Sequence, residues 1–167
     1  GDDLPALEAS IYGATSLKVN NKGEIFIVSP SGFTSVIRKV DDKGIMRKVM
    51  GTVDQDYLDS IAHSKYKGKV QTGELAIITT FSDIAFDHKG NMFISDRLNH
   101  QIRKVSAQGK ITTIAGTGES AHYGDGGPAS EASFRDPSAL TTDKEGNLYI
   151  GDGANNLVRK IDTKGIV

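Results

Sequence analysis

The sequence of 167 residues contains no cysteine. This absence excludes disulfides, zinc–thiolate sites and thiol nucleophiles, although it does not assign a compartment. No apolar run approaches the roughly 20 residues that a membrane-spanning helix needs, so we expect no membrane span. The formal net charge of −1 argues against a nucleic-acid partner, because nucleic-acid binders present a strongly basic face.

Proline is also scarce, with 4 residues, whereas glycine is abundant, with 19. This balance indicates many tight turns and excludes a collagen-like chain or a proline-rich linker. Hydrophobic residues make up 37% of the chain, which is enough for a core and argues against wholesale disorder. The length suits one domain of ordinary size.

One sequence pattern occurs three times, most clearly at 138–167, again at 82–105, and in a more divergent form at 14–40. Each copy has a short apolar run, a turn that ends in Gly, a second apolar run, and a third run that carries Arg-Lys. Internal repetition of this kind indicates one supersecondary unit used several times. The expected strands lie at 16–20, 24–28, 35–40 and 45–51, at 83–87, 91–95, 101–105 and 110–116, and at 139–143, 147–151 and 157–161.

Four short antiparallel strands in each repeated unit predict an all-β fold, a β-propeller built of four-stranded blades. We place the blades at about 14–53, 82–117 and 138–167, within a single propeller segment that spans 1–167. The third unit stops where its fourth strand begins. An insert at 54–77 has no counterpart in the other units.

Three blades are too few for a ring, because closed propellers typically have about four to eight. The opening residues 1–11 match the connection at 124–134, so the chain starts where a fourth strand would lead. We therefore expect closure to need self-association or the remaining blades of a longer chain.

The repeated unit resembles the NHL repeat. The likeness rests on residues 137–161 and 81–116, which include D-K-E-G-N-L-Y-I-G-D and D-H-K-G-N-M-F-I-S-D. It is weaker in the first unit, where Ser29 and Gly13 replace an Asp and a Pro of the motif. The resemblance implies a propeller, usually of about six blades, from a family that includes protein-binding modules, RNA-binding modules and a peptide-amidating lyase.

The connection at 124–134 contains G-D-G-G-P-A and is similar to that of bacterial NHL-repeat proteins, many of which are exported. The resemblance therefore implies a bacterial protein that is periplasmic, on the cell surface or secreted.

Functional residues of a repeat protein are expected on the long, variable loops, because the tight Gly turns serve the scaffold. In each unit the loop between the second and third strands and the connection to the next unit are predicted to share one face. The candidate ligand-binding residues of this loop-rich face are Tyr57, His63, Asp96, Arg97, Asn99, His100, His122, Asp125, Asp152, Asn155 and Asn156.

Asp96 and Asp152 occupy equivalent positions, and two interpretations are open for them. They are ligands for a metal or a cationic substrate, or they are repeat features that accept hydrogen bonds from the following loop or a nearby Arg. The repeated Arg38, Arg103 and Arg159 are likewise expected to grip an acidic ligand or to pair between blades. The second interpretation is the more economical one in both cases.

His63, His100 and His122 fall on the same predicted face, yet no two of them have the spacing of a metal-binding motif. We therefore expect no metal and no cofactor. Tyr57 and His63 belong to the insert, where helical spacing within 56–66 predicts a short amphipathic helix that acts as a lid or docking element, or packs as a surface loop.

The absence of a catalytic constellation beside a strong scaffold pattern favours a non-catalytic scaffold that recognises a protein or glycan partner through its loop-rich face. The alternative is a metal-dependent lyase or hydrolase with its site at the mouth of the propeller channel. An RNA-binding NHL module is the third hypothesis.

Overall fold

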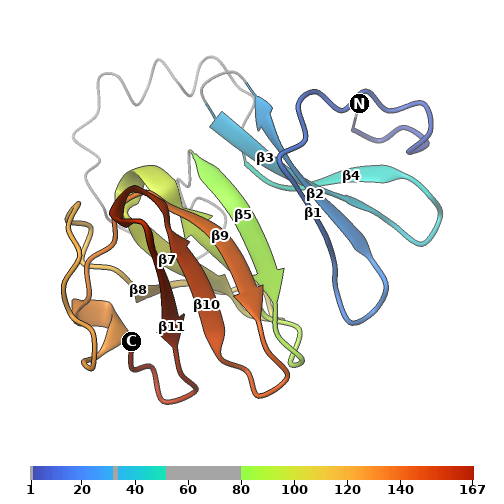
Figure 1. Ribbon diagram of the computed structural model, residues 1–167. Helices are drawn as coiled ribbons and strands as arrows, with labels where there is room; N and C mark the ends of the chain where they lie inside the picture. The colour runs from blue at the N-terminus through green and yellow to red at the C-terminus, as the bar shows by residue number, and fades with distance from the viewer. Residues whose placement is uncertain (1, 32–33, 52–79) are drawn as a thin grey trace.

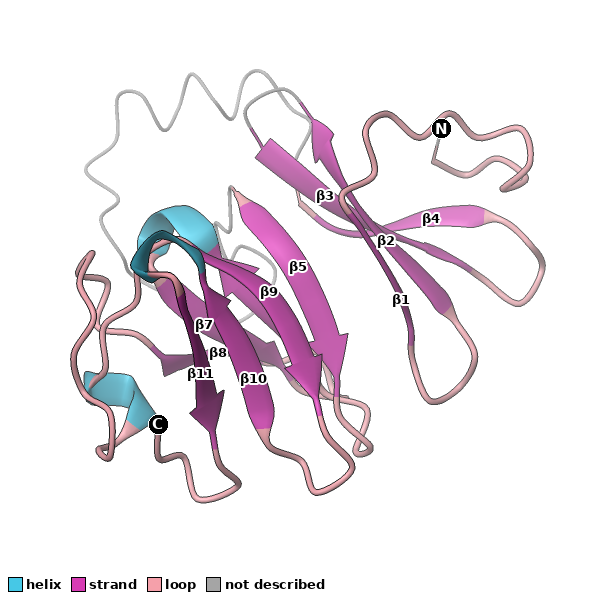
Figure 2. Ribbon diagram, viewed as in Figure 1, coloured by secondary structure: helices cyan, strands magenta, loops and turns pink. Residues whose placement is uncertain are grey.

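The computed structural model describes residues 2–31, 34–51 and 80–167, and its strands form three separate antiparallel sheets (Figure 1). Figure 2 shows that strands and loops make up nearly all of this part, with helix confined to short 3-10 turns. None of the described helices is long and apolar enough to span a membrane. The sheets confirm the predicted all-β fold of small antiparallel blades.

The first blade consists of β1 (Ser16–Val19), β2 (Ile25–Ser31), β3 (Thr34–Val40) and β4 (Met46–Met50). The second consists of β5 (Phe81–Phe86), β6 (Met92–Asp96), β7 (Gln101–Val105) and β8 (Ile111–Ala115). The third contains β9 (Pro137–Thr142), β10 (Leu148–Asp152) and β11 (Leu157–Ile161). The 3-10 turns are η1 (Arg97–Asn99), η2 (Ala129–Glu131) and η3 (Gly153–Asn155).

The strand order in each blade follows the sequence, and the expected strands differ from the observed ones only at their ends. β5 and β9 begin earlier than expected, at Phe81 and Pro137, and β6 and β10 extend to Asp96 and Asp152. A register shift in the second and third blades lets the first residue of the inner strand pair with this Asp. A β-bulge of this kind adds a residue that an alternation pattern does not reveal.

The tight turns share one side of the antiparallel blades, and those after β1, β5, β9 and β11 lie toward the lower edge of Figure 1. We call this side the turn rim. In all of the tight turns the first side chain accepts a hydrogen bond from the backbone N–H four residues later. An Asx or Ser side chain in this role satisfies a donor that the turn leaves unpaired. This explains why a residue with a short side chain that accepts hydrogen bonds recurs three positions before Gly in every turn. These residues are Asn20, Asp41, Asp87, Ser106, Asp143 and Asp162.

The second blade is covered on both faces. Ile84, Met92 and Ile94 pack with Phe26 and Val28 of the first blade. The alternate residues of the same strands face the third blade, in a core that joins Ala85, Phe93 and Ile102 to Leu140, Leu148 and Ile150. Because successive side chains of a strand point to opposite faces, burial of both faces requires the continuous apolar runs seen in the sequence.

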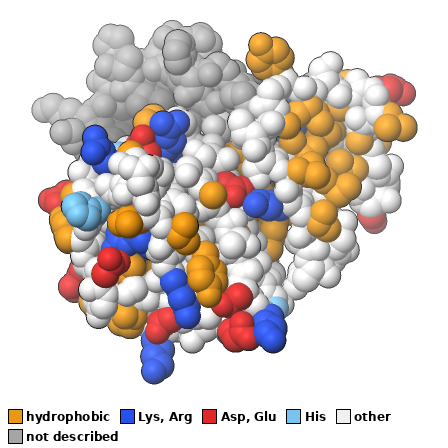
Figure 3. Space-filling view, in the orientation of Figure 1, with side chains coloured by type: hydrophobic (Ala, Val, Ile, Leu, Met, Phe, Trp, Pro, Cys, Tyr) orange, Lys and Arg blue, Asp and Glu red, His pale blue; other side chains and the backbone are white. Residues whose placement is uncertain are grey.

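The first blade has only one covered face within the described residues. Leu17 and Val19 alternate with residues that point to the second blade, and they are 64% and 59% exposed. Figure 3 shows hydrophobic side chains gathered over this side of the molecule. The outer face of the first blade therefore presents apolar side chains to solvent.

The two connections that match in sequence also match in structure. Pro5 and Pro128 each form an antiparallel bridge at the outer edge of a blade, to Ile45 and Ile166 respectively. The expectation that the whole connection at 118–135 lies on the loop-rich face is therefore wrong. Its Gly-rich part runs along the outside of the third blade, where Gly126, Gly127 and Ala129 form backbone hydrogen bonds with Gly165 and Val167.

Gly116 is a position where the fold requires glycine. It has a φ of 95°, and a Cβ would lie 2.9 Å from the Cα of Gln101. We expect Gly116→Ala to destabilise the protein by about 2–4 kcal/mol, because it adds both left-handed strain and a steric clash. Gly109 has a φ of 85° with open space around it, so Gly109→Ala is the matched control and should cost about 1 kcal/mol. Urea unfolding of both variants measures the difference, and equal losses would contradict the steric argument.

The turn hydrogen bonds predict a loss of stability in acid. Backbone hydrogen bonds lower the pKa of Asp41 and Asp162, and the side chain of Asn147 lowers the pKa of Asp143. The unfolded chain therefore binds these protons more readily, so the stabilisation is complete above about pH 4 and is lost as pH falls through the lowered folded values. Replacement of the three Asp by Asn keeps the acceptor, as in Asn20, and should flatten the acid limb of stability measured by urea unfolding. An unchanged acid limb would count against this assignment.

Candidate functional site

The loops between the second and third strands of the second and third blades form η1 and η3, and they lie at the rim opposite the tight turns (Figure 1). Each 3-10 turn ends on a left-handed residue, His100 with a φ of 54° and Asn156 with a φ of 56°. The inner strands start beside these turns, as shown by the hydrogen bonds from Arg97 N to Thr80 O and from Ala154 N to Arg135 O. We call this side the loop rim.

Asp96 and Asp152 are both fully buried at the loop rim and have internal partners. The Asp96 carboxylate accepts hydrogen bonds from Asn99 Nδ2 at 2.8 Å and Arg103 Nε at 2.9 Å. Burial raises the pKa of the Asp96 carboxyl, and the Arg103 guanidinium opposes this shift. This geometry fits the second interpretation of Asp96, as a feature of the repeat. Its carboxylate joins the following loop, through Asn99, to Arg103 of the same blade.

The Asp152 carboxylate has equivalent partners, with Asn155 Nδ2 at 2.8 Å and Arg159 Nη1 at 3.6 Å. It also accepts a hydrogen bond from the Arg135 backbone at 2.6 Å. The expected pairing of the repeated Arg between blades is wrong for Arg103, which pairs with its own blade. The β-hairpin places Asp and Arg on the same face of adjacent strands, so the nearest carboxylate is an intrablade one.

Arg97 and His100 meet Asp136 in the gap between the second and third blades. Arg97 Nη2 lies 3.3 Å from Asp136 Oδ2, and His100 Nδ1 accepts the Asp136 backbone N–H at 3.4 Å. Asp136 has a positive φ of 51°, which non-glycine residues seldom adopt. These contacts fix the relative position of the two loops at the rim.

The other predicted residues do not gather at one point. His122 and Asn156 are exposed, and Asn155 also donates to Ala121 O at 2.8 Å. Asp125 lies at the outer edge of the third blade, 2.7 Å from Arg159 Nη2. Tyr57 and His63 lie outside the described residues, as does the predicted helix at 56–66. Within the described ranges, no group of three or more His, Cys, Asp or Glu is placed to hold a metal.

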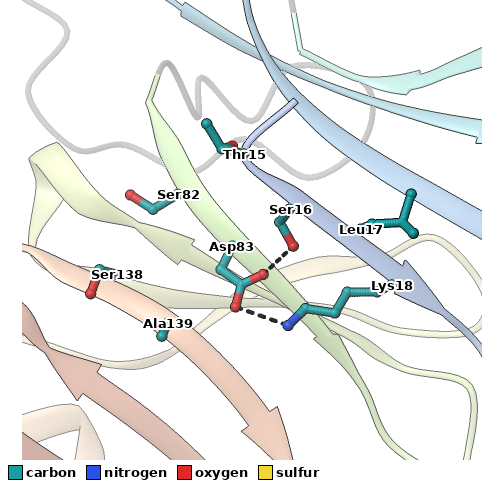
Figure 4. Close-up of a pocket in the computed structure, with 8 residues that line it drawn as sticks. All are labelled: Thr15, Ser16, Leu17, Lys18, Ser82, Asp83, Ser138 and Ala139. Carbon is teal, nitrogen blue, oxygen red and sulfur yellow. Dashed lines mark hydrogen bonds and ion pairs between the residues drawn. The ribbon is translucent and has the colours of Figure 1, made fainter. Parts of the chain in front are cut away.

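Sequence reasoning missed a pocket where the inner strands β1, β5 and β9 approach one another (Figure 4). It is open to solvent and has a volume of about 470 Å³. Its walls come from all three blades and carry hydroxyl groups, one ammonium and one carboxylate. The lining residues are Thr15, Ser16, Leu17, Lys18, Ser82, Asp83, Ser138 and Ala139.

Asp83 of the second blade is the central group of this pocket. Figure 4 shows Ser16 and Lys18 of the first blade pointing toward its carboxylate, at 2.5 Å for Ser16 Oγ and 3.1 Å for Lys18 Nζ. From the third blade, the Leu140 backbone donates to Asp83 Oδ2 at 2.8 Å. One buried carboxylate therefore links three blades; Lys18 balances its charge from one side, and the Leu140 N–H donates to it from the other.

The pocket retains polar groups that a ligand can reach. The Lys18 side chain is 32% exposed although it is paired with Asp83. The Ser82 hydroxyl has no hydrogen-bond partner among the described residues, and it faces the same space as Ser138. This arrangement suits recognition of a polar, hydroxyl-bearing ligand by hydrogen bonds.

The sequence contained a signal for this pocket, in a departure from the repeat. Asp83 occupies the position of Ser16 and Ala139 in the other units, so a charge appears at only one of the equivalent places. Lys18 likewise corresponds to Ala85 and Thr141. A comparison of the inner strands for unmatched charges would have found both residues, whereas a search for repeated residues selected the scaffold.

The family model that matches this chain and two of its relatives carry the same name, teneurin. A family model described as the teneurin NHL domain matches residues 117–167. Teneurin-1 of Gallus gallus is 25% identical over 97% of this chain and 6% of that protein. Teneurin-3 of Mus musculus is 35% identical over 47% of this chain and 3% of that protein. Together with the repeat itself, these matches support an NHL-repeat family for this chain.

The fold of this NHL-repeat chain also occurs in solved structures. An auxiliary nutrient binding protein from Bacteroides thetaiotaomicron superposes with a TM-score of 0.62 at 23% identity, over 86% of this chain and 36% of that one. The family-model match at 117–167 covers the third blade and its connection, where the repeat is clearest. The chain spans only a small part of its teneurin relatives, so their activities as whole proteins do not transfer to it.

The central role of Asp83 in this NHL-repeat chain leads to a stability prediction. Asp83→Ala removes the acceptor for Ser16, Lys18 and the Leu140 backbone, so we expect the free energy of unfolding to fall by about 2–3 kcal/mol. Ser82→Ala, at the neighbouring unpartnered residue, is the matched control and should change stability by less than about 0.5 kcal/mol. Chemical denaturation distinguishes the two, and a loss for Asp83→Ala as small as the control would refute the linking role.

Proposed function

We propose that this NHL-repeat chain is a non-catalytic binding scaffold that recognises a glycan at its loop rim, in the pocket between the inner strands. The observation that carries the proposal is the open, hydroxyl-lined pocket with Lys18 and Ser82 accessible in its wall. Ligand sites are typically clefts of about 300–1,000 Å³, and the pocket falls within this range. The solved neighbour described as a nutrient binding protein supports a binding role for this fold.

A glycan is favoured over a protein partner by the chemistry of the walls. Ser82 offers a hydroxyl donor and acceptor, and the hydroxyl oxygens of Thr15 and Ser138, which donate to backbone carbonyls, offer acceptors. These groups match sugar hydroxyls, and Lys18 adds a charged donor. The predicted face and the proposed site lie at the same rim, although the contributing residues differ from those selected by sequence. Export from a bacterial cell remains part of the proposal and rests on the family resemblance.

The metal-dependent lyase or hydrolase and the RNA-binding module stay alternatives. The charged side chains of the pocket, Lys18 and Asp83, form an ion pair. Asp83 also accepts hydrogen bonds from Ser16 and from the backbones of Leu140 and Ile84, the last at 2.8 Å. Such a carboxylate stabilises blade contacts. No described feature favours either alternative over binding.

The proposal is tested by screening the labelled protein on a glycan array and titrating the strongest glycan by calorimetry. Ser82→Leu fills the pocket without removing a hydrogen bond to a described residue, so we expect affinity to fall about tenfold or more, a free-energy difference of about 1.4 kcal/mol. Gln108→Leu is the matched control, since Gln108 is exposed on the turn rim of the same blade and should leave affinity unchanged.

The proposal fails if no glycan binds, or if Ser82→Leu binds as tightly as the parent protein. Turnover of a bound glycan together with stoichiometric metal would favour the lyase or hydrolase instead. Salt-sensitive binding of single-stranded RNA would favour the third hypothesis.

A further inference from the structure

A second pocket lies at the turn rim, on the opposite side of the molecule from the proposed glycan site. It has a volume of about 510 Å³ and lies between the turns of the first and second blades. We call it the rim groove. The residues that carry the argument are Lys22, Phe26, Val49, Phe86, Lys89 and Met92.

The floor of the rim groove is apolar and preformed. Phe26 and Phe86 form an aromatic pair with ring centroids 4.7 Å apart and planes tilted by 52°. Both rings belong to the core between the first two blades, as does Met92, so the groove is the open end of that core. Val49 forms part of the wall and is 40% exposed. An apolar side chain entering here would extend an existing core and displace water from aromatic surface.

The wall of the rim groove carries positive charge that the described residues do not neutralise. Lys22 and Lys89 are both exposed, and neither ammonium forms an ion pair within the described ranges. The acidic residue of the wall, Glu24, is already paired with Lys39 at 2.7 Å, and its hydrogen bond from Lys39 lowers the pKa of the Glu24 carboxyl. The free charge at the groove is therefore cationic, which attracts an anionic partner.

The width of the rim groove is held by a contact between its two walls. Asn21 Nδ2 donates a hydrogen bond to the backbone oxygen of His88 at 3.0 Å, joining a turn of the first blade to a turn of the second. A groove whose walls are linked in the free protein needs little reorganisation when it binds a partner.

The corresponding groove between the second and third blades is different, so the charge is not a general property of the repeat. That groove is smaller, about 230 Å³, and includes the carboxylates of Asp87, Glu145 and Asp162 in its lining. Lys89 borders both grooves, and Lys104 also lines the smaller one. Its aromatic floor is partly covered, because Lys104 Nζ lies 5.8 Å from the centre of the Phe93 ring. The rim groove differs from this groove because, among the described residues, its lining holds no carboxylate other than the paired Glu24.

We propose that the rim groove binds an acidic peptide segment of a partner protein, which inserts one large apolar side chain between Phe26, Phe86 and Val49. Carboxylates on either side of that side chain pair with Lys22 and Lys89. Two separated lysines suit a short acidic segment better than a nucleic-acid backbone, which needs a continuous basic surface. The site is independent of the proposed glycan pocket because the two lie at opposite rims.

The test uses fluorescence anisotropy with three labelled peptides: one phenylalanine flanked by glutamates, the same peptide with serine for phenylalanine, and one phenylalanine flanked by lysines. We expect the acidic phenylalanine peptide to bind at least about tenfold more tightly than the other two. Raising the salt concentration should weaken its binding because the pairs are exposed. Tight binding of the serine peptide would overturn the insertion of an apolar side chain.

Variants locate the binding on the groove. Lys22→Glu combined with Lys89→Glu should weaken binding at least about tenfold, through reversal of the wall charge. Lys43→Glu combined with Lys164→Glu is the matched control, since both lysines are exposed on the same rim and outside the groove, and the net charge changes equally. Equal losses in the two double variants would overturn the site in favour of general charge attraction.

Val49→Asp tests the apolar part of the wall, because it places a negative charge at a partly exposed position there and should abolish binding of the acidic phenylalanine peptide. Thermal unfolding of this variant and of the parent protein checks whether the variant keeps its fold. An RNA oligonucleotide that binds the groove more tightly than the acidic peptide would overturn the peptide assignment. Ser82→Leu should leave peptide binding unchanged, which separates failure of this proposal from failure of the glycan proposal.

Discussion

Asp83 is the group on which the arrangement of the three blades depends. Its carboxylate accepts hydrogen bonds from Ser16 of the first blade and from the backbone of Leu140 in the third, and it forms an ion pair with Lys18 of the first blade. A buried carboxylate is costly without such donors, so the three inner strands are held at the distances that satisfy it. The same contacts define the walls of the pocket at the loop rim.

Repeated residues and unmatched residues have different roles in this chain. The residues that recur, among them Asp96 and Asp152 with their Arg partners, close each hairpin onto its own loop. The residues that break the repeat, such as Lys18 and Asp83, face the space between blades. Because a repeat must build the same scaffold each time, side chains that differ between copies are the ones free to form a specific site.

The strands were predictable because each is short, apolar and bounded by a turn with a strong local preference. The six Asx or Ser turns, such as those at Asp41 and Asp162, follow from hydrogen bonds within a few residues of chain. The pockets were not predictable in the same way. The rim groove joins Phe26 to Phe86, and the inner pocket joins Lys18 to Asp83, across separations that no local pattern encodes.

The sequence by itself determined the blade, its strand order and its repetition, since hydrogen bonds and alternation within one unit suffice to specify them. Only the tertiary structure decided which charges are used internally and which remain accessible. Asp96 and Asp83 are both acidic residues of strands, yet one closes a loop within its blade and the other joins three blades. The difference arises from the packing of one blade on the next, which brings together residues that are distant in the chain.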